Sequence, residues 1–317
     1  MAFAFIFPGQ GSQSVGMGKD LADNFQSARE VFEEVDSVLS QPLSKIMWEG
    51  PSETLTLTAN TQPALMATSV AAIRVLEADF GVDVTAANYV AGHSLGEYSA
   101  LCSTGAISLA DTARLLRLRG EAMQKAVPVG TGAMAALLGA SVEDAEKAAE
   151  FGSKSGICQI ANDNATGQIV LSGEVAAIEA ACSFAREAGV KKAVILPVSA
   201  PFHCDMMTPA ADVMRDALAN VEINMPSVTM VNNVTAQPVL SASQIREDLV
   251  AQVTGRVRWR ETIEWMASPD GGIESFAEPG CGKVLTQMLK RIVKGVSGKA
   301  LNTPESLENF AKELETS

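Results

Sequence analysis

The residues with the clearest chemical meaning are Ser94 and the two histidines of this 317-residue chain. Ser94 lies between Gly92 and Gly96, where an apolar strand is expected to run into a helix. This Gly-x-Ser-x-Gly pattern is typical of a nucleophile elbow, a sharp turn that exposes a serine hydroxyl. Small residues are needed there because the backbones come close on either side of the serine. Ordinary glycine-rich turns also carry the pattern, so its context must decide.

A serine hydroxyl needs a base that takes its proton. His93 adjoins Ser94, and neighbouring side chains at a strand end point in different directions, so we expect it to shape or pack the elbow. His203 is therefore the candidate base by elimination. No acid between Ser94 and His203 stands out as its partner, since Asp163 and Glu174 fall in a separate unit. A backbone carbonyl or amide side chain is the expected substitute for the acid of a triad.

An arginine is expected on the apolar face of a helix over residues 108–127. At 100° per residue Arg114 and Arg117 fall on the polar face, whereas Arg119 falls among the leucines and alanines. An inward arginine must be paired with a carboxylate or must await one from a ligand. A structural ion pair and a snorkelling side chain are the alternatives.

The loop at residues 8–13 follows the first apolar strand, residues 3–7. Its glycines allow backbone N–H groups to point at a small group, as in an oxyanion hole, although a plain turn is also possible. It is not a phosphate-binding Walker A loop, because no Gly-Lys-Ser/Thr follows.

Strands alternate with helices along most of the chain, which predicts an α/β fold with a mainly parallel sheet, resembling an α/β-hydrolase core. Strands are expected at 3–7, at 228–234 and at 273–277, with a further strand and the elbow over 89–104. Helices are expected at 19–39, 61–80, 108–127, 206–220, 242–253, 259–267 and 283–294, with a last amphipathic helix. A capping box of Ser108 and Asp111 is expected to begin the 108–127 helix.

Residues 128–199 have the order βαββαβ, which is that of a ferredoxin-like subdomain. Strands are expected at 132–139, 157–162, 168–172 and 192–198, with helices at 142–151 and 174–188. We therefore expect a discontinuous catalytic core, residues 1–127 and 200–317, with 128–199 inserted.

The composition excludes several classes of function. A formal charge of −13 disfavours nucleic acid or an anionic membrane as partner. No apolar run reaches the roughly 18 residues of a membrane span, and no signal-peptide pattern begins the sequence. Five cysteines without a Cys-x-x-Cys motif favour buried thiols in the cytoplasm, and with two histidines they make a metal site improbable.

Four segments together resemble one family, the bacterial malonyl-CoA:acyl carrier protein transacylases of fatty acid and polyketide synthesis. They are Phe7–Gln13, Gly92–Tyr98, Arg117–Gly120 and Pro201–His203, in the family's order. The resemblance covers essentially the whole chain. It implies a ping-pong acyltransferase that moves a malonyl group from malonyl-CoA to the phosphopantetheine thiol of acyl carrier protein, with no cofactor and no metal.

The resemblance also implies roles for individual residues. Ser94 would carry the malonyl ester, His203 would transfer the protons, and Arg119 would bind the free malonyl carboxylate. The backbone N–H groups of Gln10 and Leu95 would form the oxyanion hole.

Further residues match the family more loosely. Gln252 would orient the histidine through its main-chain carbonyl, and Asn162 and Asn164 would lie near the channel for CoA or the carrier protein. Phe202 replaces a smaller residue of some relatives, which bears on the acyl group chosen. Because CoA and carrier protein are anionic, local cations are expected at the mouth, with Lys191, Lys192, Lys283, Lys290, Arg291 and Lys294 as candidates.

Three alternatives remain at the level of sequence. The first is a serine hydrolase or thioesterase of the same fold, which would have no need of Arg119. The second is an acyltransferase for another carboxylated acyl-CoA, such as methylmalonyl-CoA. The third is a non-catalytic docking subunit that keeps the fold.

Overall fold

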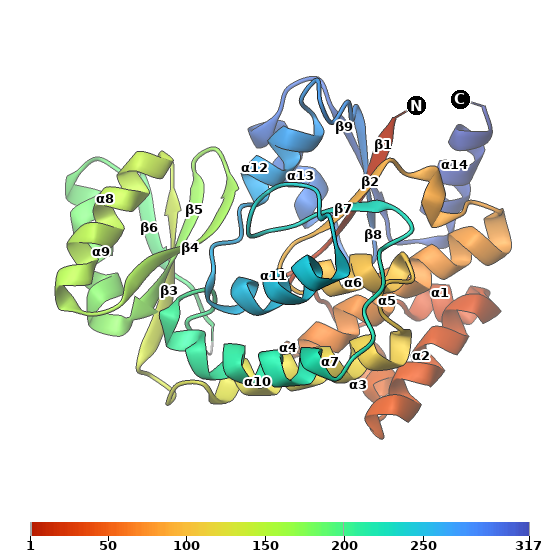
Figure 1. Cartoon of the computed structure of the whole chain (residues 1–317), viewed down its shortest axis with the longest axis horizontal. Helices are drawn as coiled ribbons and strands as arrows, with labels where there is room; N and C mark the ends of the chain where they lie inside the picture. The colour runs from red at the N-terminus through yellow and green to blue at the C-terminus, as the bar shows by residue number, and fades with distance from the viewer. Residues whose placement is uncertain (1, 199, 317) are drawn as a thin grey trace.

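The strands of the chain form two sheets, which lie side by side in Figure 1. The computed structural model describes residues 2–198 and 200–316. The strands are β1 (Phe3–Phe7), β2 (Tyr89–Gly92), β3 (Gly132–Leu138), β4 (Cys158–Ala165), β5 (Gln168–Glu174), β6 (Lys192–Ile195), β7 (Thr229–Val231), β8 (Ser275–Pro279) and β9 (Ser297–Leu301). The larger sheet has the order β7-β2-β1-β8-β9 and the smaller one β4-β5-β3-β6.

Helices pack around both sheets (Figure 1). They are α1 (Lys19–Asn24), α2 (Gln26–Leu39), α3 (Leu43–Glu49), α4 (Ser52–Thr56), α5 (Thr58–Phe80), α6 (Gly96–Ser103), α7 (Leu109–Lys125), α8 (Val142–Gly152), α9 (Val175–Glu187), α10 (Thr208–Ala219), α11 (Ala242–Thr254), α12 (Trp259–Met266), α13 (Val284–Ile292) and α14 (Pro304–Glu315). The α/β fold class predicted from the alternation of strands and helices is confirmed. Among the described residues no helix is long and apolar enough to cross a membrane.

The larger sheet is parallel throughout, and its central strand β1 is buried along its whole length. β1 pairs with β2 in a register that sets Phe7 opposite Gly92. The carboxyl ends of parallel strands share one edge, where open α/β sheets bind ligands. The loop after β1 and the elbow after β2 therefore lie next to each other at that edge.

The smaller sheet is antiparallel, and α8 and α9 cover it at the left of Figure 1. An alanine-rich core fills the space beneath these helices. The sheet is nevertheless attached to the rest of the molecule, because Asp163 N–H donates to Val257 O (2.9 Å) and Val257 N–H to Ala161 O (2.8 Å). The division into domains at residues 128 and 199 stays a prediction.

Some elements differ from those expected. The helix over 19–39 is two helices, because Phe25 is extended (φ −128°). α3, α4 and β9 were not predicted, since short helices and an edge strand with exposed residues carry little periodic signal. At the start of α7 the Ser108 hydroxyl accepts from Asp111 N–H, which is one bond of the expected capping box. The Asp111 carboxylate, however, accepts from the Ser108 hydroxyl and not from the Ser108 main-chain N–H, so the capping box is incomplete.

Candidate active site

The elbow places Ser94 at the end of β2 in a left-handed backbone conformation (φ +54°). The two glycines permit this turn because the neighbouring backbone is so close. A Cβ on Gly92 would come within 1.9 Å of the Gly96 carbonyl carbon, and a Cβ on Gly96 within 2.2 Å of Phe7 O. No side chain fits at these distances, so both positions require glycine.

The structure brings Ser94 and His203 together, although 109 residues separate them. Ser94 Oγ lies 2.9 Å from His203 Nε2, and both residues are buried. His203 Nδ1 lies 2.8 Å from the main-chain oxygen of Gln252, which can only accept. His203 therefore carries its proton on Nδ1 and presents an unprotonated Nε2 to the serine.

The surroundings keep His203 neutral. Burial and the positive charge of Arg119 lower the pKa of His203 to about 3. A neutral imidazole that accepts from a serine hydroxyl can take the proton when that oxygen attacks an acyl carbon. No carboxylate supports the histidine among the described residues, as Asp163 pairs with Arg260 (2.7 Å) and Glu174 accepts from Ile157 N–H.

Arg119 lies inside the molecule, 1% exposed, with its guanidinium next to the serine. Its Nη1 donates to Gln62 Oε1 (2.9 Å), and its Nη2 donates to Gln252 Oε1 (2.8 Å) and Ser94 Oγ (3.2 Å). Its Nε has no partner among the described residues. Burial lowers the pKa of Arg119, whereas Tyr98 and Glu97 act in the opposite direction. A buried guanidinium bonded only to neutral groups is suited to receive an anion.

Arg117 differs from its expected position in solvent. It donates to Asn60 Oδ1 (2.7 Å) and Gln41 Oε1 (2.5 Å), and thereby joins α7 to α5 and to the loop after α2. Arg114 is exposed and pairs with Asp111, as its place on the polar face predicts.

Gln10 and Leu95 line the same cavity as Ser94 and His203. Neither of their backbone N–H groups has an acceptor within the described part of the chain. Leu95 directly precedes α6, whose N-terminal end also favours negative charge. The two N–H groups thus remain available for an oxygen bound beside Ser94.

Asn162 and Asn164 reach the cavity from β4, which carries two bulges at this point. Bulges often redirect side chains next to a site. Asn164 Oδ1 lies 2.8 Å from His93 Nε2, and the His93 ring packs edge-on against Trp259. His93 thus connects the elbow to the smaller sheet, beside the serine rather than bonded to it.

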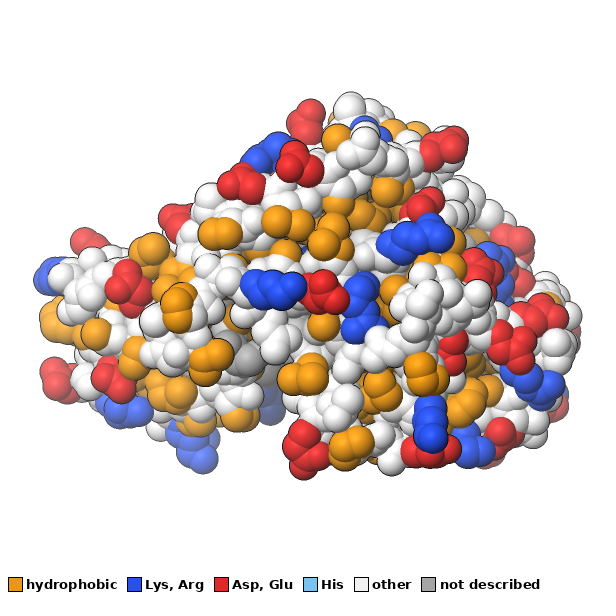
Figure 2. Space-filling model, turned by 90° about the horizontal axis from the view of Figure 1, so that it is seen from below, with side chains coloured by type: hydrophobic (Ala, Val, Ile, Leu, Met, Phe, Trp, Pro, Cys, Tyr) orange, Lys and Arg blue, Asp and Glu red, His pale blue; other side chains and the backbone are white. Residues whose placement is uncertain are grey.

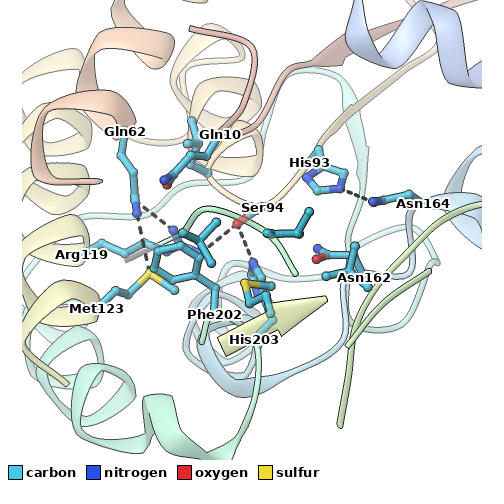
Figure 3. Close-up of a pocket in the computed structure, with 15 residues that line it drawn as sticks. Gln10, Gln62, His93, Ser94, Arg119, Met123, Asn162, Asn164, Phe202 and His203 are labelled. Carbon is cyan, nitrogen blue, oxygen red and sulfur yellow. Dashed lines mark hydrogen bonds between the residues drawn. The ribbon is translucent and has the colours of Figure 1, made fainter. Parts of the chain in front are cut away.

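The cavity measures about 190 Å³, and Figure 3 shows Ser94 at its centre. Arg119 and His203 approach Ser94 from different sides (Figure 3), and Phe202 lines the same cavity. The lining residues are Gln10, Gln62, His93, Ser94, Leu95, Arg119, Met123, Met134, Asn162, Asn164, Val170, Leu196, Val198, Phe202 and His203. No group of three or more His, Cys, Asp or Glu suited to a metal occurs among the described residues.

Three residues around the serine were not predicted from the sequence: Gln62, Glu97 and Asn233. Asn233 accepts from Ser94 N–H (2.8 Å) and donates to Gly92 O (2.7 Å), so it fastens the elbow. Its position just after β7, at the carboxyl edge of the sheet, could have identified it. Glu97 could have been noticed as an acid on an apolar helix.

The candidate cations do not line this cavity. Arg291 donates to Gln168 Oε1 (3.3 Å), between α13 and β5. On the face of the molecule in Figure 2, basic and acidic side chains are intermixed, with hydrophobic side chains between them. Any role of these cations in binding an anion stays a prediction.

Fold and site together define an α/β protein with a serine nucleophile elbow. The sequence pattern of the acyl transferase domain matches residues 4–303, so the chain belongs to this family.

Relatives resemble the chain over nearly their whole length. The malonyl CoA-acyl carrier protein transacylase of Escherichia coli K12 is 44% identical, with 96% of this chain and 97% of the relative covered. A crystal structure of acyl-carrier-protein-S-malonyltransferase from Bartonella henselae is 53% identical, with a TM-score of 0.96 and coverage of 99% and 100%. A malonyl-transacylase solved in complex with a type II polyketide acyl-carrier protein is 42% identical, with a TM-score of 0.95 and coverage of 99% and 100%.

Proposed function

We propose that this protein transfers a malonyl group from malonyl-CoA to the phosphopantetheine thiol of acyl carrier protein, through an ester on Ser94. One observation carries the proposal. The buried guanidinium of Arg119 lies 3.2 Å from the Ser94 hydroxyl, and its Nε has no hydrogen-bond partner among the described residues. If an acetyl group is bound, this buried charge stays unpaired. If a malonyl group is bound, its free carboxylate pairs with the guanidinium.

In the first half-reaction Ser94 Oγ attacks the thioester carbon, and its proton passes to His203 Nε2. The N–H groups of Gln10 and Leu95 stabilise the negative oxygen of the tetrahedral intermediate. The carbon–sulfur bond then breaks, the CoA sulfur takes the proton from His203, and the malonyl ester remains on Ser94. Arg119 holds the remote carboxylate and so fixes the orientation of the acyl group.

The second half-reaction reverses these steps with a different thiol. His203 takes the proton of the carrier-protein thiol, whose sulfur attacks the ester carbon. The carbon–oxygen bond to Ser94 then breaks, and Ser94 Oγ takes the proton back from His203 Nε2. Gln252 keeps the imidazole oriented through its main-chain oxygen. Asn162 and Asn164, which line the cavity, would contact the pantetheine arm.

The relatives support the substrate and the partner. Several are called malonyl CoA-acyl carrier protein transacylases, and one similar structure holds an acyl-carrier protein. Since Ser94, His203 and Arg119 supply the nucleophile, the base and the anion site, we infer that the reaction needs no cofactor besides its substrates. We place it in fatty acid biosynthesis in the cytoplasm, which the five cysteines without a Cys-x-x-Cys motif favour.

Mass spectrometry of the protein after mixing with malonyl-CoA tests the proposal. We expect a malonyl adduct on the peptide that contains Ser94, and no adduct on Ser94→Ala. No adduct on the native protein would refute the proposal and favour a docking subunit.

A competition between malonyl-CoA and methylmalonyl-CoA in the same assay tests the alternative acyl group. A preference for methylmalonyl-CoA would assign the enzyme to that substrate instead.

A further inference from the structure

Glu97 is a buried acid beside the site that has no part in the proposed chemistry. It lies on α6, three residues after Ser94, and its side chain is 0% exposed. A buried carboxylate is costly unless hydrogen bonds replace its water. Here Oε1 accepts from the main-chain N–H of Asn233, and Oε2 accepts from Gln252 Nε2 at 2.6 Å.

The side-chain amide of Gln252 connects Glu97 to Arg119. Gln252 Nε2 donates to Glu97 and to the main-chain oxygen of Ser94 (3.0 Å), whereas Gln252 Oε1 accepts from Arg119 Nη2 (2.8 Å). A guanidinium can only donate and an ionised carboxylate can only accept. The two charges therefore determine which end of the amide faces which neighbour.

We propose that Glu97 is a positioning residue for the acyl-carboxylate site: its ionised carboxylate fixes the amide of Gln252, and Gln252 Oε1 then holds Arg119 in place. The inference rests on the proposed function, because it assumes that Arg119 binds the carboxylate of the acyl group. Glu97 touches neither the substrate nor the reacting atoms, and it acts through Gln252.

Only an ionised carboxylate satisfies both neighbours of Glu97. In Glu97→Gln the new amide must direct its oxygen at Asn233 N–H, because a main-chain donor cannot turn. Its NH₂ group then faces the NH₂ group of Gln252. If Gln252 turns to avoid this, it presents NH₂ to Arg119 and loses the Ser94 carbonyl. Either arrangement weakens the bond that holds Arg119.

A proton on Glu97 has the same effect, because it places an O–H among groups that already donate. Burial raises the pKa of Glu97 to about 8; Asn233 N–H, Arg119 of α7 and Gln252 lower it, and Asp248 of α11 raises it. Glu97 therefore loses its proton as the pH rises through about 8. The preference for carboxylated acyl groups should rise with it.

The ratio of kcat/KM for malonyl transfer to kcat/KM for acetyl transfer tests this between pH 6 and pH 9. The ratio cancels the ionisation of the acceptor thiol and of His203, which both acyl groups share. We expect it to rise with pH in the native protein. In Glu97→Gln we expect it to be flat and, at pH 9, about tenfold lower than in the native protein, as for a hydrogen bond lost to a charged group.

Glu278→Gln is the matched control. Glu278 is equally buried but accepts from Leu285 N–H (3.0 Å) and Thr286 N–H (2.8 Å) at the start of α13. This variant should lose stability and keep the native ratio at every pH.

Two results would overturn the inference. One is a flat ratio in the native protein, which decides the matter even if Glu97→Gln does not fold. The other is a folded Glu97→Gln with the native ratio. If the native protein forms no malonyl ester at any pH, the proposed function fails together with this inference. If the ester forms and the ratio is flat, this inference alone fails.

Discussion

We propose that Arg119 decides which acyl group the site accepts, because its buried guanidinium lies next to Ser94. We expect Arg119→Ala to lower kcat/KM for malonyl transfer by about 100-fold, since hydrogen bonds to charged groups contribute about 1.5–3 kcal/mol. Acetyl transfer should fall much less, so the preference shifts toward acetyl. Steady-state rates with both thioesters measure this, and Arg114→Ala on the exposed side of α7 is the control. Unchanged selectivity would remove Arg119 from its proposed role.

His203 should remain neutral well below the usual titration range of histidine, since its pKa is lowered to about 3. Labelling of Ser94 by phenylmethanesulfonyl fluoride, an uncharged reagent, should therefore keep nearly the same rate from pH 8 to pH 5. A labelling rate that halves near pH 6.5 would contradict this.

The lowered pKa of His203 also affects stability, because below about pH 6.5 the unfolded chain binds a proton that the folded chain does not. The contribution of His203 to the free energy of unfolding should thus fall as the pH drops toward 3, whereas that of Glu97, whose pKa is raised, changes in the opposite direction.

The sequence alone predicted Ser94, His203 and Arg119 because each has a local signal. Ser94 lies in an elbow motif, His203 is one of two histidines, and Arg119 is a charge on an apolar helix face. It could not reveal the links among them. Asn233 and Gln252 meet the elbow only after the sheet has assembled, 139 and 158 residues from Ser94. In the sequence, Asn233 is marked only by its position just after a strand, and Gln252 only by its match to the family.

At the scale of elements, the turn from β2 into α6 depends on Gly96, because a Cβ there would lie 2.2 Å from Phe7 O of β1. We expect Gly96→Ala to lower the free energy of unfolding by about 3 kcal/mol or more, at the upper end for overpacking. Urea denaturation measures the change. Gly105→Ala is the control: its Cβ meets open space at φ +73°, so strain alone should cost about 1–2 kcal/mol. Equal effects would argue against close packing at the elbow.

Long periodic elements were predictable, and short ones were not. The burial of β1 and the order of strands and helices from residue 128 to residue 199 follow from apolar runs and turn residues. The pairing of β4 with the loop before α12 could not be predicted in this way, because it consists of an isolated bridge between Asn162 and Val257. This bridge helps to position Asn162 and Asn164 beside the cavity.

At the scale of the whole molecule, the smaller sheet should unfold together with the larger one. Met134, Ala161 and Val170 of the smaller sheet belong to the main hydrophobic core, and the buried Asp163 pairs with Arg260 of α12. We propose that residues 128–199 form an inserted subdomain that is not independently stable.

Two probes in urea test this. The fluorescence of Trp259 and the other tryptophans reports on the core, and the exposure of the Cys158 and Cys182 thiols reports on the smaller unit. The two transitions should coincide. Asp163→Asn should shift both to lower urea by an equal amount, since breaking a buried pair costs about 3–5 kcal/mol. Separate transitions would show that the inserted unit folds alone.

The proposed reaction requires that Ser94 carry an acyl group between two thiols. The most direct test isolates the malonyl-protein and measures how its malonyl group divides between acyl carrier protein and water. We predict that nearly all of it appears on the carrier thiol, with little free malonate. Release of free malonate at the same rate with and without the carrier protein would contradict the claim and identify a hydrolase.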